Sequence, residues 1–203
     1  MSSGRTNPRN REIPEVRRKL LIEAAMRSIA KFGYAGTTIE TICTEAQVSR
    51  GLINHHFGSK EELIRQSYKA LRDEWVAQTH GSLLSSYAEP EDKLKAMIRV
   101  SFGPTMFKPE YLGIWAGFWS AISKSPALRK LNRELFEKDR VAYQEIFEAI
   151  ASKRGKKIDS RRAALSIIAL IDGFWLEWCL DPKGFTAEEA EDACLSFARQ
   201  AFA

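Results

Sequence analysis

The stretch Thr37–Leu63, TTIETICTEAQVSRGLINHHFGSKEEL, predicts two short helices, a tight turn between them and the start of a third helix. Thr37 and Glu40 have the spacing of a capping box, in which a hydroxyl and a carboxylate accept hydrogen bonds from free amides at a helix start. Ile42 and Ala46 lie one turn apart and belong to an apolar face. The first helix is therefore expected to begin at Thr37 and to bury this face.

The second helix is expected over residues 50–57, after Ser49 as the N-cap residue. Ile53 and Phe57 form an i, i+4 pair that faces the core, and Gly58 can end the helix with a positive φ. A third helix should follow at once, because Ser59 and Glu62 again have capping-box spacing. The other side chains of the second helix point outward: Arg50, Gly51, Leu52, Asn54 and His55.

This pair of helices has the geometry that fits the major groove of DNA, because its second helix exposes hydrogen-bonding side chains near the N-terminus. Gly51 favours the same interpretation. A glycine in so short a helix costs about 1 kcal/mol relative to alanine, which is easier to understand where the backbone approaches a partner closely. A helical hairpin with a solvated polar face has the same periodicity. If DNA is the partner, Arg50, Asn54 and His55 should make base or near-base contacts.

The region from about Val16 to Leu63 resembles the N-terminal domain of the TetR (tetracycline-repressor) family of bacterial regulators. The matching residues are Gly36-Thr37-Thr38, Ile42, Ala46, Val48-Ser49-Arg50-Gly51, His55-His56-Phe57 and Ser59-Lys60-Glu61. The chain departs from the family at Asn54, where Tyr is usual, and at Leu52, where Thr or Ser is frequent, so no operator sequence is implied. The resemblance implies that backbone phosphates are contacted, and the DNA-binding part positioned, by Thr38, Ser49, His56 and Lys60.

Composition and charge agree with a globular protein that has a polyanionic partner. Of the 203 residues, 44% are hydrophobic, and the net charge is +5. Basic residues crowd the N-terminal part, at Arg5, Arg9, Arg11, Arg17, Arg18 and Lys19. Residues 1–12 have hardly any apolar side chain, which predicts a flexible basic arm. The arm is either a contact to DNA or a solubilising tail.

The cysteine and histidine patterns predict no metal site and no cofactor. Cys43, Cys179 and Cys194 are far apart and lack C-x-x-C spacing, which favours reduced thiols in a cytoplasmic protein. His55 and His56 are neighbours on a helix and point about 100° apart, so they cannot readily share a metal. The N-terminus lacks the apolar region of a signal peptide, and no window is expected to approach the length and hydropathy of a membrane-spanning run.

No segment shows strand alternation, so the fold class is predicted to be all-α, with about nine helices. Residues 13–62 are expected to form a three-helix helix-turn-helix DNA-binding domain, and residues 63–203 an effector-binding and dimerisation domain. A helix over residues 59–80 would connect the two. Further helices are predicted over residues 16–33, 91–102, 109–123, 126–155, 159–181 and 186–201. Gly33 is expected to end the first of these, and Thr186 with Glu189 to form a capping box at the start of the last. The last two helices have wide apolar faces, which favours a homodimer formed through them.

Aromatic residues gather on two helices of the second half, as Trp115, Phe118 and Trp119 on one and Trp175 and Trp178 on the other. An aromatic stripe of this kind is typical of an ordinary core. It also suits the wall of a ligand cavity, since several tryptophans are hard to bury with their N–H groups unpaired. Asp172 lies one turn before Trp175 in the apolar run LSIIALIDGFWLEWCL, where an unpaired carboxylate would be costly to bury. A carboxylate beside indole faces suits a cation.

The resemblance is narrower here, to a choline-responsive branch of the same family. It rests on Phe118-Trp119, Pro126-Ala127-Leu128 and residues 170–176, LIDGFWL, together with residues 51–57. It implies a repressor released from an operator by a small quaternary-ammonium effector, with ligand contacts from Trp115, Phe118, Trp119, Asp172, Trp175 and Trp178. Three alternatives stay open: a sensor of broader lipophilic cations, an architectural DNA-binding protein without a ligand, and a small-molecule enzyme. No nucleophile-and-base set or glycine-rich phosphate loop supports the enzyme.

Overall fold

The computed structural model describes residues 8–80 and 85–203, and every regular element in these two ranges is a helix. This confirms the predicted all-α fold class. The helices are α1 (Pro8–Gly36), α2 (Ile39–Ala46), α3 (Arg50–Phe57), α4 (Lys60–Thr79), α6 (Pro90–Phe102), α7 (Pro109–Lys124), α8 (Pro126–Lys153), α9 (Ser160–Leu180) and α10 (Ala187–Gln200).

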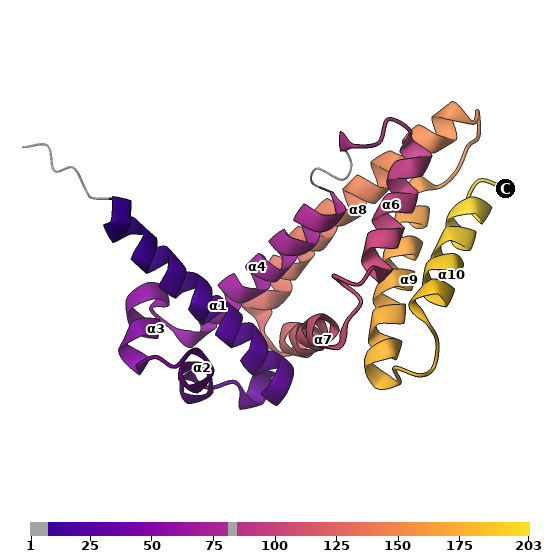
Figure 1. Cartoon of the computed structure of the whole chain (residues 1–203). Helices are drawn as coiled ribbons and strands as arrows, with labels where there is room; N and C mark the ends of the chain where they lie inside the picture. The colour runs from indigo at the N-terminus through magenta and orange to yellow at the C-terminus, as the bar shows by residue number, and fades with distance from the viewer. Residues whose placement is uncertain (1–7, 81–84) are drawn as a thin grey trace, which may run out of the picture.

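Helices α1, α2 and α3 form an N-terminal three-helix unit, called the head below, at the left of Figure 1. Helix α4 leaves the head and runs beside α8 into the C-terminal part, where α6, α8, α9 and α10 lie together. Helix α7 packs against α1 on one side and against α8 and α9 on the other. The predicted domain boundary between residues 62 and 63 falls in the first turn of α4, and it stays a prediction.

Helix α1 begins earlier than the sequence indicated. Residues 8–12, which were expected to belong to a flexible arm, are helical, and residues 1–7 lie outside the described part of the chain. Gly33 has φ 66°, so the regular helix is interrupted where the sequence predicted its end. The lack of apolar residues in 8–12 misled the prediction, because Pro8 is well suited to a first helical turn and polar residues can continue it.

The capping box of α2 is one residue later than predicted. Thr38 is the N-cap residue, its Oγ1 accepts a hydrogen bond from the Thr41 N–H (3.2 Å), and the Thr41 Oγ1 accepts one from the Thr38 N–H (2.9 Å). Thr37 is buried and donates its hydroxyl proton to the Gly33 carbonyl (2.7 Å), so it completes the end of α1 instead. The expected Thr37–Glu40 box was therefore wrong.

Two further predicted boxes have different outcomes. At α10, Thr186 and Glu189 form the reciprocal box as predicted. At α4, the Ser59 Oγ accepts from the Glu62 N–H (3.1 Å), but the Glu62 carboxylate accepts hydrogen bonds from Arg65 and Gln66 instead of turning back. Only half of the Ser59–Glu62 box therefore forms.

Helix α9 is more apolar than was predicted from the sequence. It has the length and mean hydropathy (1.6) of a membrane-spanning helix, so the prediction that no window approaches such a span was wrong. A single helix of this kind also occurs in soluble cores, and α9 packs against α7, α8 and α10. Only 33% of its most apolar window is buried, and its exposed large apolar residues are Leu165, Leu176 and Leu180. This helix therefore presents an uncovered apolar face.

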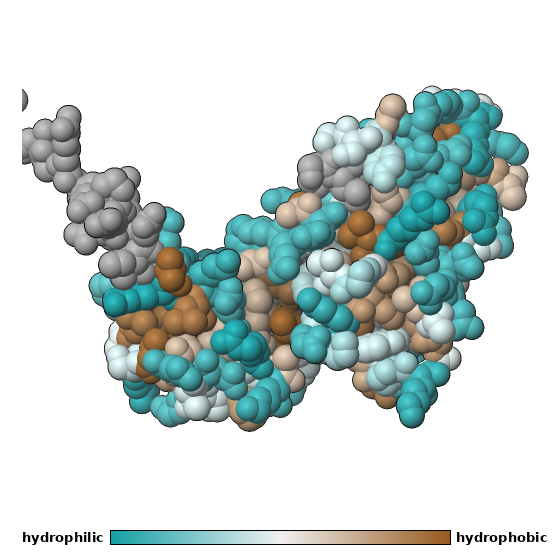
Figure 2. All heavy atoms as spheres, viewed as in Figure 1, coloured by the Kyte–Doolittle hydropathy of each residue, from teal (hydrophilic) through white to brown (hydrophobic). Residues whose placement is uncertain are grey.

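The head and the C-terminal part share one hydrophobic core. At the contact between α1 and α7, Gly117 lies so close to Ile29 that a Cβ added to the glycine would be 2.5 Å from the Ile29 Cγ2. Trp175 links α9 to α6 within the core, because its Nε1–H donates a hydrogen bond to the Ser101 carbonyl (3.0 Å). On the face shown in Figure 2, hydrophobic residues appear in patches between hydrophilic ones.

Candidate DNA-binding surface and effector pocket

The outward face of α3 carries the predicted base-contacting residues. Ile53 and Phe57 are buried and anchor the helix, which ends at Gly58 with φ 73°. Ser49 occupies the N-cap position but makes no capping hydrogen bond with its side chain, which leaves the hydroxyl available to a phosphate. Exposed residues of α3 are Arg50, Gly51, Asn54 and His55, and Leu52 is half-buried.

One shallow hollow brings together residues from the starts of α2, α3 and α4. Thr38, Arg50, Asn54 and Lys60 all line it. Within the free head, Arg50 Nη1 pairs with Glu40 Oε1 (3.3 Å), and both side chains are exposed. Lys60 Nζ donates to the Thr37 carbonyl (3.0 Å), so it also links α4 to the start of α2. The structure thus groups separate predicted contact residues on one surface.

His56 differs from His55 in being half-buried. Burial is the main cause that lowers the pKa of His56, followed by the nearby charges of His55, Arg17 and Arg18. Sequence reasoning missed the role of Arg18, whose Nη1 donates to the His56 carbonyl (3.2 Å) and whose guanidinium lies 4.6 Å from the Phe57 ring centroid. Arg18 therefore fixes α3 against α1.

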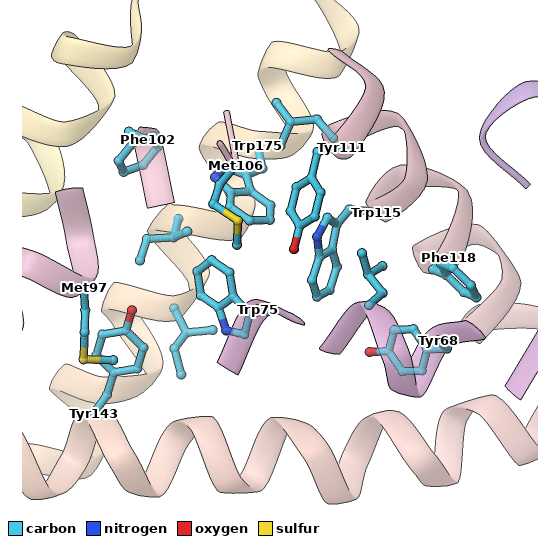
Figure 3. Packing of buried hydrophobic residues seen from close by; sticks show 14 of the residues in the cluster. Tyr68, Trp75, Met97, Phe102, Met106, Tyr111, Trp115, Phe118, Tyr143 and Trp175 are labelled. Atoms are coloured by element: carbon cyan, nitrogen blue, oxygen red, sulfur yellow. The ribbon is translucent and has the colours of Figure 1, made fainter. Parts of the chain in front are cut away.

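The second candidate site is a pocket between α4, α7, α8 and α9. It is lined by Arg72, Trp75, Trp115, Phe136, Asp139, Tyr143, Ile168, Ile171, Asp172 and Trp175. Figure 3 shows Trp75, Trp115 and Trp175 grouped in the core, with Tyr111 beside them. The ring centroids of Trp75 and Trp175 are 5.2 Å apart, and those of Trp115 and Trp175 are 5.7 Å apart, with edge-to-face geometry.

Three of the six predicted ligand contacts line this pocket, namely Trp115, Asp172 and Trp175. The other three do not. Phe118 lies against Tyr68 in the core, as Figure 3 shows, with ring centroids 5.1 Å apart. Trp119 packs on Trp115, with ring centroids 6.2 Å apart, and Trp178 packs on Phe107, with ring centroids 5.2 Å apart.

Sequence reasoning missed an ion pair in the pocket wall. Arg72 from α4 pairs with Asp139 from α8, and their side chains are only 9% and 8% exposed. The Arg72 guanidinium also lies 5.5 Å from the Trp115 ring centroid. Burial raises the pKa of Asp139 even though Arg72 opposes the rise. The attraction of Arg72 therefore does not fully offset the free-energy cost of removing the Asp139 carboxylate from water.

Asp172 was expected to be a costly buried carboxylate, but its residue surface is exposed. Asp172 belongs to the lining of the pocket and is also exposed to solvent, so it lies at the mouth of the pocket. The enclosing protein is the main cause that raises the pKa of Asp172, Arg72 opposes the rise, and Asp139 adds to it. The deeply buried carboxylate of the pocket is Asp139.

Buried polar atoms without a protein hydrogen-bond partner concentrate around this pocket. In the described part of the chain they are Arg72 Nε, His80 Nε2, Tyr111 OH, Trp115 Nε1 and Tyr143 OH. Arg72, Trp115 and Tyr143 line the pocket, the Tyr111 ring touches Trp115, and the His80 ring touches Tyr143. Each such atom normally costs about 1–3 kcal/mol. This concentration is typical of a site that a polar ligand or water completes.

His80 should make the protein more sensitive to acid. Burial lowers its pKa from 6.5 to about 4, with a smaller effect of Arg72. The unfolded chain therefore binds a proton that the folded chain rejects, and stability present above pH 6.5 is lost progressively as the pH falls toward 4. We expect the melting temperature of His80→Gln to fall less than that of the wild type between pH 7 and pH 4.5. Equal losses in both proteins would contradict this role.

A helix-turn-helix head joined to a helical domain with a candidate ligand pocket is the architecture of a ligand-responsive DNA-binding regulator. Two family models match the chain. "Bacterial regulatory proteins, tetR family" covers residues 21–66, and "BetI-type transcriptional repressor, C-terminal" covers residues 90–203. The chain belongs to the TetR family of transcriptional regulators, which confirms the family resemblance and the predicted class.

Similar proteins agree with this assignment. The regulator BetI of Paraburkholderia phymatum is 31% identical over 87% of this chain and 88% of its own length. BetI of Burkholderia mallei is 33% identical over 82% and 83%. A transcriptional regulator from Pseudomonas aeruginosa has a similar structure (TM-score 0.84, 30% identity, 92% and 90% covered). A regulator from Saccharomonospora viridis, solved in complex with choline, shares the fold (TM-score 0.79, 20% identity, 91% and 96% covered).

Proposed function

We propose that this protein is a repressor that binds operator DNA as a homodimer and is released by a small cationic effector of the choline type. The observation that carries the proposal is the tryptophan-walled pocket with two carboxylates, in a domain of the BetI type. The proposed place of action is the cytoplasm, where operator DNA is found. The names of the relatives favour a regulator over the alternative of an enzyme.

The pocket chemistry supports a methylated cation. An indole face attracts a quaternary ammonium by roughly 0.5–2 kcal/mol, and such an ion needs no hydrogen bond from the protein. Asp172 at the mouth and Asp139 inside supply negative charge. The choline found in the structure of the Saccharomonospora viridis regulator points to the same ligand class. A sensor of broader lipophilic cations would use the same aromatic walls without a fixed ammonium site.

The effector proposal is tested by calorimetric titration with choline and with its uncharged isostere, 3,3-dimethyl-1-butanol. We expect the charged ligand to bind more tightly and Asp172→Asn to weaken its binding. Equal affinity for both ligands removes the cation site from the proposal. A gel shift with DNA upstream of the protein's own gene, with and without choline, tests operator binding and release separately.

Homodimerisation is proposed through α9 and α10. The argument is the uncovered apolar face of α9, where Leu180 is 71% exposed and Leu176 is 44% exposed. The double variant Leu176→Glu with Leu180→Glu should raise the dimer dissociation constant at least tenfold, about 1.4 kcal/mol, because it would bury charge in the interface. Sedimentation velocity measures this. Val76→Glu is the matched control, since Val76 is an exposed apolar residue on α4. An unchanged constant in the double variant would place the interface elsewhere.

Arg50 is the strongest candidate for a base contact. It projects from the first turn of α3 and is held near the hollow by Glu40. Arg50→Ala should weaken binding to the operator by about 1–3 kcal/mol and relax the preference for operator over random DNA. Fluorescence anisotropy with both DNAs measures the two effects. Equal weakening on both DNAs would assign Arg50 to a phosphate instead.

A further inference from the structure

The effector pocket has too little free space for the proposed ligand. The cavity volume is about 20 Å³, which is close to the space that one water molecule needs. A choline-sized molecule is several times larger. Its entry therefore requires that at least one lining side chain moves out. Trp75, Trp115 and Trp175 are packed against one another by ring contacts, so they are poor candidates for this movement.

Arg72 already makes the contacts that a bound ammonium would make. Its guanidinium lies over the face of Trp115, 5.5 Å from the ring centroid, and it pairs with the buried Asp139. An indole face and a carboxylate are the two groups that recognise a methylated cation. The chain thus supplies a cation of its own to the pocket.

Charge balance also singles out Arg72. A second cation placed beside the buried Arg72 guanidinium would be repelled by it in a medium of low dielectric constant, and Asp172, the other carboxylate of the lining, is exposed to water and offsets this repulsion less. Exchange of one cation for another leaves the charge of the pocket unchanged. Arg72 is also incompletely bonded, because its Nε has no hydrogen-bond partner in the protein. A long, flexible and under-bonded side chain is the group that moves most easily.

We propose that Arg72 is an internal ligand of the effector pocket, and that a quaternary-ammonium effector binds by displacing its guanidinium from Trp115 and Asp139. This inference rests on the cationic effector proposed above. It adds that the Arg72 guanidinium occupies the cation site when no effector is bound. The apparent affinity for the effector is then reduced by the population in which Arg72 fills the pocket.

The position of Arg72 connects the displacement to the head. Arg72 lies on α4, which begins at Lys60 directly after α3 and the Gly58 turn. Displacement removes the ion pair between α4 and α8, the pair that joins these helices beside the pocket. A ligand changes DNA affinity only if it favours one arrangement of the protein over another. The arrangements with Arg72 paired to Asp139 and with Arg72 released differ in this way, because the effector binds only to the second.

The test compares Arg72→Met with Lys69→Met in the full-length protein. Lys69 lies on the same helix and pairs with Asp73 (2.5 Å), but it is exposed and outside the pocket. Calorimetry with choline should give at least tenfold tighter binding for Arg72→Met, because the competing guanidinium is gone and Asp139 is left for the ammonium to pair with. Lys69→Met should bind choline as the wild type does. Weaker or unchanged binding by Arg72→Met overturns the proposal.

A second measurement does not depend on the stability of the variant. In a crystal structure of the wild-type protein with choline, the ammonium should lie over Trp115 and the Arg72 guanidinium should have left Asp139. Choline bound with the Arg72–Asp139 pair intact overturns the displacement while it leaves the cationic effector in place. If neither wild type nor Arg72→Met binds choline, the cation site and the displacement are both wrong. Operator binding without effector tests the regulator function independently of these outcomes.

Discussion

Operator affinity is expected to fall by about 10³–10⁵ between 50 and 200 mM salt, if a dimer neutralises roughly 6–10 phosphates. On each head, phosphate contacts are proposed for Thr38, Ser49, His56 and Lys60. Of these only Lys60 has a basic side chain that releases a counterion, so other basic residues of the head are expected to neutralise the remaining phosphates. Substitution of Lys60 by Met should remove one phosphate contact per subunit. The slope of log affinity against log salt should then become less steep by about 1.8 per dimer.

Fluorescence anisotropy at a series of salt concentrations gives this slope directly. Lys69→Met is the control, because it removes the same charge from α4 at an exposed site away from the hollow. We expect the control to keep the slope of the wild type. Nearly salt-independent binding by the wild type would contradict the proposed phosphate contacts. An unchanged slope in Lys60→Met would mean that this ammonium serves only its hydrogen bond to the Thr37 carbonyl.

The second large effect is expected on stability. Arg72→Met should lower the free energy of unfolding by about 3–5 kcal/mol, because it leaves the buried Asp139 without its partner. The double variant Arg72→Met with Asp139→Leu should recover most of this loss, since an apolar pair of similar volume avoids the desolvation cost. Urea unfolding of the wild type and both variants measures the difference. A double variant as unstable as the single one would show that the ion pair itself stabilises the fold.

The elements with strong local signals could be predicted from the sequence. Gly58 ends α3, and Thr186 with Glu189 begins α10, because each signal acts within a few residues. The start of α2 was mistaken because two threonines are adjacent, and either can cap. Thr37 instead donates a hydrogen bond to the Gly33 carbonyl at the end of α1, and this contact depends on how α1 ends. Capping spacing alone does not contain that information.

The effector pocket was predicted less completely, since it combines helices that are far apart in the chain. Arg72 and Asp139 are 67 residues apart, and only the packing of α4 against α8 brings them together. A signal for each was present, however. Asp139 stands four residues after Leu135 and four before Tyr143, and Arg72 stands between Tyr68 and Trp75. A charged residue inside an apolar stripe marks a buried polar site.

Asp172 shows the opposite error. It also lies in an apolar run, but α9 is rotated so that the residue reaches the mouth of the pocket beside the uncovered face. The periodicity of a helix that is apolar on most sides does not fix which side faces the core. Phe118 and Trp178 were placed in the ligand site for the same reason, and the structure assigns them to aromatic contacts elsewhere.

The close contact of Gly117 with Ile29 constrains how the head can move. Gly117 contributes no side chain at this point, so Ile29 packs directly on the α7 backbone and resists sliding of α1 along α7. This contact is therefore the point about which the head is expected to rotate. A shift of α4 near Arg72 would turn the head about this point instead of translating it, and a small rotation there becomes a larger change in the spacing of the two α3 helices of a dimer.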